Sequence, residues 1–337
     1  MELLSLLYPH SLSLAVSMKR RDKRHYPADS LKTPRFTGPF TFARLPHVRE
    51  PEGLDAAFIG APFDGGVVFR SGARFGPSAV RQGSLLLRLY NPALGVKPFD
   101  ILEIADMGDI TVVPSSLERT YENISDAIRK LLQARVTPVV CGGDHSITLP
   151  ILREIKSVHG KIALIHFDSH LDTVDSHFSL RYTHGTVFRR ALEEGLIEGD
   201  RSVHAGIRGG LFSEDEIKRA EEEGFTVISM DDIDRIGARK VAASIAKRVG
   251  DYPCYVSFDI DACDPAYAPG TGTPEVGGLT SREALLLVRG LTGLRLVGFD
   301  LVEVSPQYDH GEITAILAAN LIYEFMSLLA LSKIKRG

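Results

Sequence analysis

The stretch that most constrains this chain runs from Lys161 to Asp172, with the sequence KIALIHFDSHLD. Its first half is apolar and β-branched, which predicts a strand buried on both faces of a parallel sheet. Its end turns polar and contains Asp168, His170 and Asp172. In open α/β folds, ligands bind at the edge where the strands end. Two carboxylates and an imidazole at such a strand end therefore predict a metal site.

Strand and helix patterns alternate from about Asp55 onward. Besides the strand at Lys161, short apolar runs predict strands over residues 56–61, 101–105, 136–141, 202–207, 225–229, 254–261 and 294–299. Helices are predicted from Pro77 and over residues 117–134, 187–194, 214–223, 238–249, 282–291 and 312–331. No linker, internal repeat or break in composition divides this region. The pattern predicts a single three-layer α/β/α domain with a mostly parallel, doubly wound sheet, over residues 41–337.

Composition limits the class of protein. With 337 residues, of which 44% are hydrophobic and 24% charged, the chain can bury a full core. A net charge of −4 gives no reason to expect a nucleic-acid partner or an anionic membrane. The three cysteines, Cys141, Cys254 and Cys263, form no C-x-x-C pair. This count fits a reducing cytoplasm and argues against a zinc site made of thiolates.

The N-terminal segment, residues 1–40, has a different character. Residues 1–16 are mildly apolar, and a basic run over residues 19–24 follows them. A secretory signal carries its positive charge before the apolar stretch, and this stretch is too short to span a bilayer. Two interpretations stay open, namely translation that begins at Met18 and a poorly ordered N-terminal arm.

Three further strand ends carry polar side chains. The sequence GGDHS follows one strand and places His145 at the sheet edge, because two glycines allow a tight turn. Asp259 and Asp261 close the strand over 254–261, where they alternate with an apolar residue and are expected to point the same way. Two such buried carboxylates repel each other unless a cation lies between them. Glu303 comes just after the last predicted strand.

The candidate metal ligands at these strand ends are four carboxylates and two imidazoles. That number of ligands exceeds the need of one tetrahedral zinc and suits two harder divalent ions. The predicted metal ligands are His145, Asp168, His170, Asp172, Asp259 and Asp261.

Four motifs, in their order along the chain, resemble those of the ureohydrolase family of arginases, agmatinases and related guanidino-acid hydrolases. They are GGDHS at 142–146, FDSHLD at 167–172, SFDIDACDPAYAPGTGTPEVGGLT at 257–280 and VEVSP at 302–306. The resemblance extends from about Asp55 to the C-terminus. It implies two Mn²⁺ ions bridged by Asp168 and Asp259, although Ni²⁺ or Co²⁺ would also suit the ligands. By the same resemblance, His145 and Asp172 complete one ion, and His170 and Asp261 complete the other.

The resemblance also implies the reaction, which is hydrolysis of a guanidinium group to urea and an amine. Glu303 matches the guanidinium-binding glutamate of the family, and a carboxylate suits the planar fork of N–H donors of a guanidinium. His184 matches the histidine that shuttles a proton, with a helix-capping imidazole as the alternative role. Asp172 is a second candidate for passing on a proton. A homo-oligomer, a trimer or a hexamer, is expected.

The substrate is the least determined feature of the sequence. Arginases carry Ile-Asn where this chain has Thr173-Val174, so the contact to an α-amino-acid head is missing and arginine should be a poor substrate. The stretch His184–Arg190 and the loop before Pro77 look more like agmatinases and guanidinobutyrases. Agmatine and 4-guanidinobutanoate are therefore the expected substrates. In that loop, Arg70 and Arg74 either bind a distal carboxylate of the substrate or serve packing or an interface.

Two alternatives of other classes remain from the sequence. One is a catalytically silent homologous subunit or a metal-stabilised scaffold. The other is a deacetylase on a related fold, although zinc sites of that kind need fewer carboxylates. Urea release from a panel of guanidino compounds would separate these possibilities.

Overall fold

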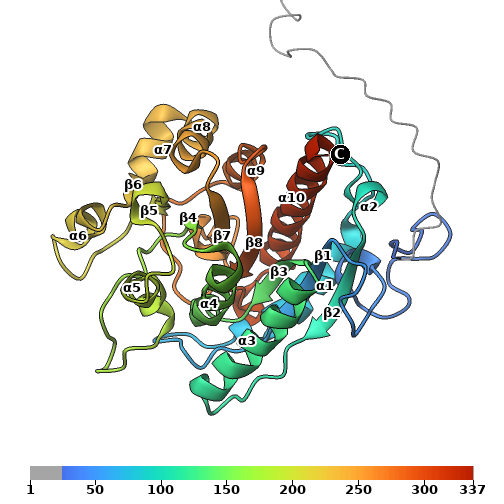
Figure 1. The fold of residues 1–337 in the computed structure, drawn as a ribbon, viewed down its shortest axis with the longest axis horizontal. Coiled ribbons are helices and arrows are strands. Elements are labelled where there is room, and N and C mark those ends of the chain that lie inside the picture. Colours follow the sequence, from blue (N-terminus) through green and yellow to red (C-terminus); the bar gives the residue numbers. More distant parts are fainter. Residues whose placement is uncertain (1–24, 337) are drawn as a thin grey trace, which may run out of the picture.

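The structure, a computed structural model, describes residues 25–336; residues 1–24 and 337 lie outside the described part. Eight strands form one parallel sheet in the order β2-β1-β3-β8-β7-β4-β5-β6 (Figure 1). The strands are β1 (Ala56–Ala61), β2 (Ile104–Asp109), β3 (Thr137–Gly142), β4 (Ala163–Phe167), β5 (Val203–Ile207), β6 (Thr226–Ser229), β7 (Pro253–Asp259) and β8 (Arg295–Val302). The predicted fold class is confirmed, and the sheet is parallel throughout.

Helices cover both faces of the sheet, and this produces three layers (Figure 1). One face packs against α3 (Leu117–Gln133), α4 (Thr148–His159), α5 (Val187–Glu193) and α6 (Glu216–Glu222). The other face packs against α1 (Gly76–Gly83), α2 (Pro98–Ile101), α7 (Met230–Ile236), α8 (Ala238–Val249), α9 (Ser281–Arg289) and α10 (Ile313–Arg336). Both faces are apolar because every strand in the middle of such a sheet is covered on each side.

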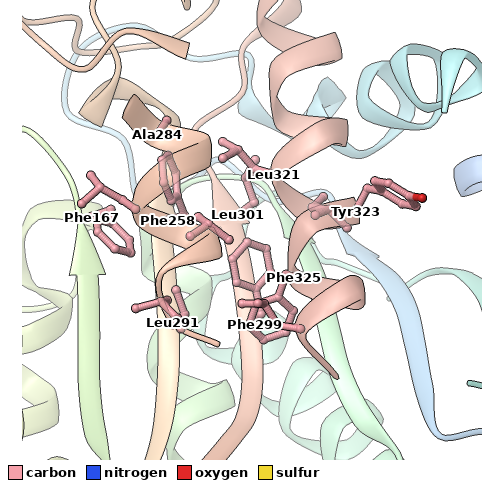
Figure 2. Packing of buried hydrophobic residues seen from close by; sticks show 14 of the residues in the cluster. Phe167, Phe258, Ala284, Leu291, Phe299, Leu301, Leu321, Tyr323 and Phe325 are labelled. Carbon is pink, nitrogen blue, oxygen red and sulfur yellow. The ribbon is translucent and has the colours of Figure 1, made fainter. Parts of the chain in front are cut away.

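The longest helix, α10, belongs to the core. Figure 2 shows Phe325 of α10 against Phe299 of β8, and their rings stack with centroids 4.2 Å apart. Within residues 25–336, one helical stretch, Ile313–Lys335, is long and apolar enough to cross a membrane by length and composition. Of its most apolar window, 83% is buried inside the fold. Its apolar character is therefore explained by packing against the sheet.

Three predicted strand boundaries are wrong, and the structure explains two of the errors. The last strand, expected over 294–299, continues to Val302. The strand expected over 254–261 ends at Asp259, because the Asp259 side chain accepts the N–H of Asp261 at 2.9 Å and starts a 3₁₀ turn over Ile260–Ala262. The expectation that Asp259 and Asp261 lie on one strand and point the same way is therefore wrong. The strand expected over 101–105 lies at Ile104–Asp109 instead.

The misplaced strand β2 contains a buried ion pair that could not be recognised from the sequence. Asp106 lies inside β2 and is fully buried, because the guanidinium of Arg81 binds both of its carboxylate oxygens at 2.8 and 3.0 Å. A charged residue can occupy a buried strand when a partner satisfies it. The short helix that begins at Pro98 ends at Ile101, the first residue of the predicted strand.

The predicted N-terminal arm, residues 1–40, is described only from His25 onward. His25 is buried, and its N–H donates to Glu103 at 3.2 Å. The boundary at residue 40 stays a prediction.

Candidate metal centre and active site

Four neighbouring strands bring the predicted site residues to one edge of the sheet. In spatial order, β3, β8, β7 and β4 lie side by side, and their carboxyl ends lead to His145, Glu303, Asp259 and Asp168. All four residues are buried, with exposed fractions of 3% or less. The chain connects these strands in a different order, so the edge lies where the winding of the sheet changes direction. Ligand sites of open α/β sheets lie at such points.

His145 stands at the centre of the first group of ligands. Its Nδ1 atom lies 2.9 Å from Asp172 Oδ2 and 3.2 Å from both Asp168 Oδ2 and Asp259 Oδ2. No hydrogen-bond partner satisfies this buried nitrogen within the described part of the chain. Three carboxylate oxygens around one unpaired imidazole nitrogen make a site that a cation completes.

The other ring nitrogen of His145, Nε2, is hydrogen-bonded to Ser257. Nε2 lies 2.8 Å from Ser257 Oγ, and Ser257 donates its hydroxyl proton to Asp300 at 2.6 Å. The Ser257 oxygen must therefore accept from the imidazole, and this places the ring proton of His145 on Nε2. The lone pair on Nδ1 then faces the carboxylates, as metal ligation requires.

A second group of ligands lies on the other side of Asp168. His170 Nδ1 is 3.3 Å from Asp168 Oδ1 and 3.2 Å from Asp261 Oδ2. Asp168 thus presents Oδ1 to this group and Oδ2 to the group around His145. His170 is the more open ligand, with a third of its side chain exposed, whereas Asp261 is fully buried. The six predicted ligands therefore gather in two adjoining groups.

Electrostatics show that the carboxylates need a counter-charge. Burial raises the pKa of Asp259 well above its ordinary value, and the charges of Asp261 and Asp168 raise it further. Burial and Asp168 also raise the pKa of Asp261, although His170 opposes this rise. Buried like charges of this kind cannot all stay ionised without a cation. The carboxylate oxygens and imidazole nitrogens of these residues are ligands that suit divalent metal ions.

Glu303 and His184 form a second element of the site. Glu303 Oε1 accepts from the main-chain N–H of His145 at 2.8 Å and from His184 Nδ1 at 2.9 Å. Its other oxygen, Oε2, is buried and has no partner among the described residues. Glu303 and Asp172 both have positive φ values, 66° and 53°. Strain of this kind at non-glycine residues concentrates in functional sites.

The loop before α1 fixes the position of His184. The Val68 N–H donates to His184 Nε2 at 3.2 Å, and the His184 N–H donates to the Gly66 carbonyl at 3.0 Å. Asp144 anchors the same loop by accepting the Gly66 N–H at 2.6 Å. Burial raises the pKa of Asp144 to about 7, and the nearby charge of Glu303 adds to the rise.

The two loop arginines have different surroundings. Arg74 pairs with the buried carboxylate of Asp64, so it packs the loop together. Arg70 has no carboxylate within 4 Å among residues 25–336, and its guanidinium lies over the rings of Phe69 and Tyr308 at 5.3 and 5.1 Å. The structure therefore favours the packing role for Arg74 and leaves the charge of Arg70 available.

Sequence reasoning missed the residues that hold the ligands. His166 donates toward Asp168, while Ser257 and Asp300 support His145. A signal for His166 did exist, because it precedes Asp168 by two residues and strand side chains two apart share a face. No comparable signal marks Asp300, whose role depends on β8 lying next to β7.

Comparison with known proteins agrees with this geometry. Residues 54–328 match the Arginase family. The chain belongs to the arginase family. It is 45% identical to a guanidinobutyrase of Pseudomonas aeruginosa over 308 residues, 90% of this chain and 97% of that protein. It is 42% identical to a mitochondrial agmatinase of Gallus gallus, over 94% of this chain and 93% of that protein.

A solved structure agrees as well. Proclavaminate amidinohydrolase from Streptomyces clavuligerus superimposes with a TM-score of 0.86 at 42% identity, and the match covers 89% of this chain and all of that one. The predicted family resemblance is confirmed. This arginase-family member is a metal-dependent amidinohydrolase, and the deacetylase alternative is no longer favoured.

Proposed function

We propose that this arginase-family enzyme hydrolyses a linear guanidino carboxylate of the 4-guanidinobutanoate type to urea and an amine. The observation that carries the proposal is the buried, unpartnered Oε2 atom of Glu303 beside the metal ligands. An unsatisfied buried carboxylate oxygen is costly, unless a ligand supplies the donor.

A glycine lies next to the unpartnered oxygen of Glu303. Gly272 lies beside it, and a Cβ atom there would come within 2.8 Å of the Arg70 carbonyl oxygen and 3.9 Å of Glu303 Oε2. The close approach of the Arg70 backbone therefore requires glycine at this position. A guanidinium donates from a planar fork, so its N–H groups can bind Oε2 while its carbon faces the ligand groups.

Two Mn²⁺ ions are proposed for the ligand groups, with Asp168 and Asp259 as bridging ligands. His145 and Asp172 would complete one ion, and His170 and Asp261 the other. When bound, such an ion pair lowers the pKa of a shared water and so supplies hydroxide near neutral pH. Asp168 supports the bridging assignment, because its Oδ2 faces the group around His145 and its Oδ1 faces the group around His170.

Proton transfer is proposed for His184 and Asp172. When its ring is neutral, His184 donates from Nδ1 to Glu303 and accepts from Val68 at Nε2. A proton that arrives at Nε2 must displace the Val68 contact, so the loop over residues 66–68 is expected to shift during turnover. Asp172 lies 2.9 Å from His145 Nδ1, where it can accept a proton released within the first ligand group.

The distal end of the substrate is proposed to meet Arg70. The Arg70 backbone lies beside Gly272, and its guanidinium has no carboxylate partner in the described chain. An arginine in this loop without a carboxylate partner would attract a distal carboxylate and repel a distal ammonium, which favours 4-guanidinobutanoate over agmatine. Arginine should be at least ~10²-fold poorer than the best compound, because its α-amino-acid head would be buried unpaired.

A urea-release assay with purified protein and Mn²⁺ tests the proposal. The panel contains 4-guanidinobutanoate, 3-guanidinopropanoate, agmatine and arginine. Arg70→Gln should raise KM for 4-guanidinobutanoate and leave agmatine unaffected or improved, whereas the surface control Arg119→Gln should change neither. Arginine as the best substrate would contradict the assignment. Absence of urea from every compound would revive the silent-subunit alternative.

We also propose a homo-oligomer, a trimer or a hexamer, in the cytoplasm. Several large apolar side chains are exposed on the described surface, among them Leu31, Phe36, Phe69, Phe178 and Phe212. An assembly would cover part of this exposed apolar surface. The three cysteines are unpaired, which fits a reducing compartment. Light scattering after size-exclusion chromatography would measure the assembly, and cell fractionation the location.

A further inference from the structure

Two histidines lie directly behind the ligand Asp168. His166 of β4 and His204 of β5 are opposite each other in the register of the two strands, and both are fully buried. Their Nδ1 atoms are 2.7 Å apart. On its other side, His166 Nε2 lies 2.8 Å from Asp168 Oδ2. A continuous line of hydrogen bonds therefore runs from the core of the protein to a carboxylate that faces both ligand groups.

The hydrogen atoms along this line follow from the partners. A carboxylate oxygen accepts, so His166 must carry its proton on Nε2 to bind Asp168. In the neutral ring, Nδ1 of His166 is then an acceptor. The only remaining donor for the contact between the two rings is Nδ1–H of His204. If His204 carried its proton on Nε2 instead, a neutral His166 would have to present a lone pair to Asp168.

This arrangement leaves one atom of His204 unsatisfied. Its Nε2 is buried without a partner in the described chain. The His204 ring itself contacts the rings of Phe188 and Phe225, with ring centroids 5.8 and 4.3 Å apart. A buried polar atom without a partner destabilises the folded state. An apolar residue would fill this aromatic pocket without that cost. The loss is offset only if the bond made by Nδ1 serves the site.

We propose that His204 is a positioning residue that holds His166 in the tautomer able to donate to Asp168, and thereby strengthens the binding of divalent metal. The inference rests on the metal centre of the proposed function. It also assigns His166 a place behind the metal site, because both of its nitrogens are used in hydrogen bonds, one to Asp168 and one to His204.

The physical effect acts on the orientation of Asp168. Its Oδ1 accepts the main-chain N–H of His170 at 2.6 Å, and its Oδ2 accepts from His166, so one contact on each oxygen fixes the carboxylate plane. The remaining lone pairs then point toward the two ligand groups. Losing the His166 contact would allow the carboxylate to turn. Mutation of groups that hold metal ligands typically costs 10–100-fold in metal affinity or activity.

The test measures Mn²⁺ affinity of the metal-free full-length protein by competition with a chelator. His204→Leu and His204→Phe both remove the donor and keep the site apolar. His204→Asn retains an N–H donor close to the position of Nδ1. Phe225→Leu is the matched control, because it disturbs packing on the same ring and leaves the donor in place. Thermal unfolding of each metal-free variant reports its loss of stability.

We expect about 10–100-fold weaker Mn²⁺ binding in the Leu and Phe variants, and near wild-type binding in His204→Asn and in Phe225→Leu. Wild-type affinity in a folded Leu or Phe variant would overturn the inference. So would an Asn variant as weak as the Leu variant, or a Phe225→Leu protein that loses the same affinity. If one apolar variant does not fold, the other decides.

The metal-binding measurement is independent of the substrate assignment. Urea release does not enter it, so a protein that cleaves none of the guanidino compounds could still show the His204 effect. In that case the proposed activity fails and the positioning role stands. Unchanged affinities together with normal urea release would instead exclude the positioning role and leave the proposed activity standing.

Discussion

Replacement of Glu303 by glutamine isolates guanidinium binding from metal binding. Glu303 Oε1 receives two donors, the His145 N–H and the His184 Nδ1–H. In the variant, the amide oxygen must take the Oε1 position, because an NH₂ group there would face two donors. The NH₂ group then occupies the position of Oε2 and meets the N–H groups of the substrate. A charged acceptor is therefore exchanged for a donor, while the fold around it is kept.

The size of the effect follows from that exchange. A hydrogen bond to a charged group contributes about 1.5–3 kcal/mol. At about 1.4 kcal/mol for each tenfold change, kcat/KM should fall by about 10- to 150-fold. The metal ligands are untouched, so elemental analysis should find the metal content of the wild type. Urea release at several substrate concentrations gives kcat/KM.

The surface variant Glu118→Gln, at the exposed start of α3, is the control and should match the wild type. A Glu303→Gln enzyme within twofold of wild type would refute guanidinium binding at Oε2. A variant that loses metal together with activity would show that Glu303 supports the metal centre instead.

Three further predictions concern the metal ligands, the shuttle and the loop. Chelation should abolish activity, and added Mn²⁺ should restore it. Asp259→Asn should lose metal and nearly all turnover, whereas His145→Asn should keep one ion. Equal metal content in the two variants would contradict the bridging role of Asp259. Burial lowers the pKa of His184, but the Glu303 carboxylate outweighs it and raises that pKa from 6.5 to about 9 in the metal-free protein. This raised pKa should contribute on the order of 3 kcal/mol to stability, fully present below pH 6.5 and lost as pH rises through about 9, so thermal unfolding of metal-free His184→Asn should lack that pH dependence. Asp64→Asn removes the buried partner of Arg74 and should speed amide hydrogen exchange of residues 65–75. It should also lower kcat, because this loop contacts His184. Unchanged exchange would show that the ion pair does not hold the loop.

Some features follow directly from local sequence. The apolar, β-branched run before Asp168 can bury both faces only inside a parallel sheet, so it reveals the strand and the edge at which its polar end lies. The same holds for His145 after a strand and two glycines. Periodicity failed where a side chain redirected the backbone, as Asp259 does by capping the turn that carries Asp261. It also failed in β2, where Asp106 is buried with a partner 25 residues away.

The sequence by itself therefore determined most of the elements, the parallel sheet and the residue types of the site, because these depend on neighbours along the chain. The tertiary structure alone decided which strands lie side by side, and so which side chains meet. Only the placement of β7 and β4 next to each other divides Asp168 between two ligand groups. Only the pairing of β4 with β5 sets His204 behind His166. Such contacts join residues far apart in sequence, and strand order is fixed by packing of the whole sheet rather than by any local pattern.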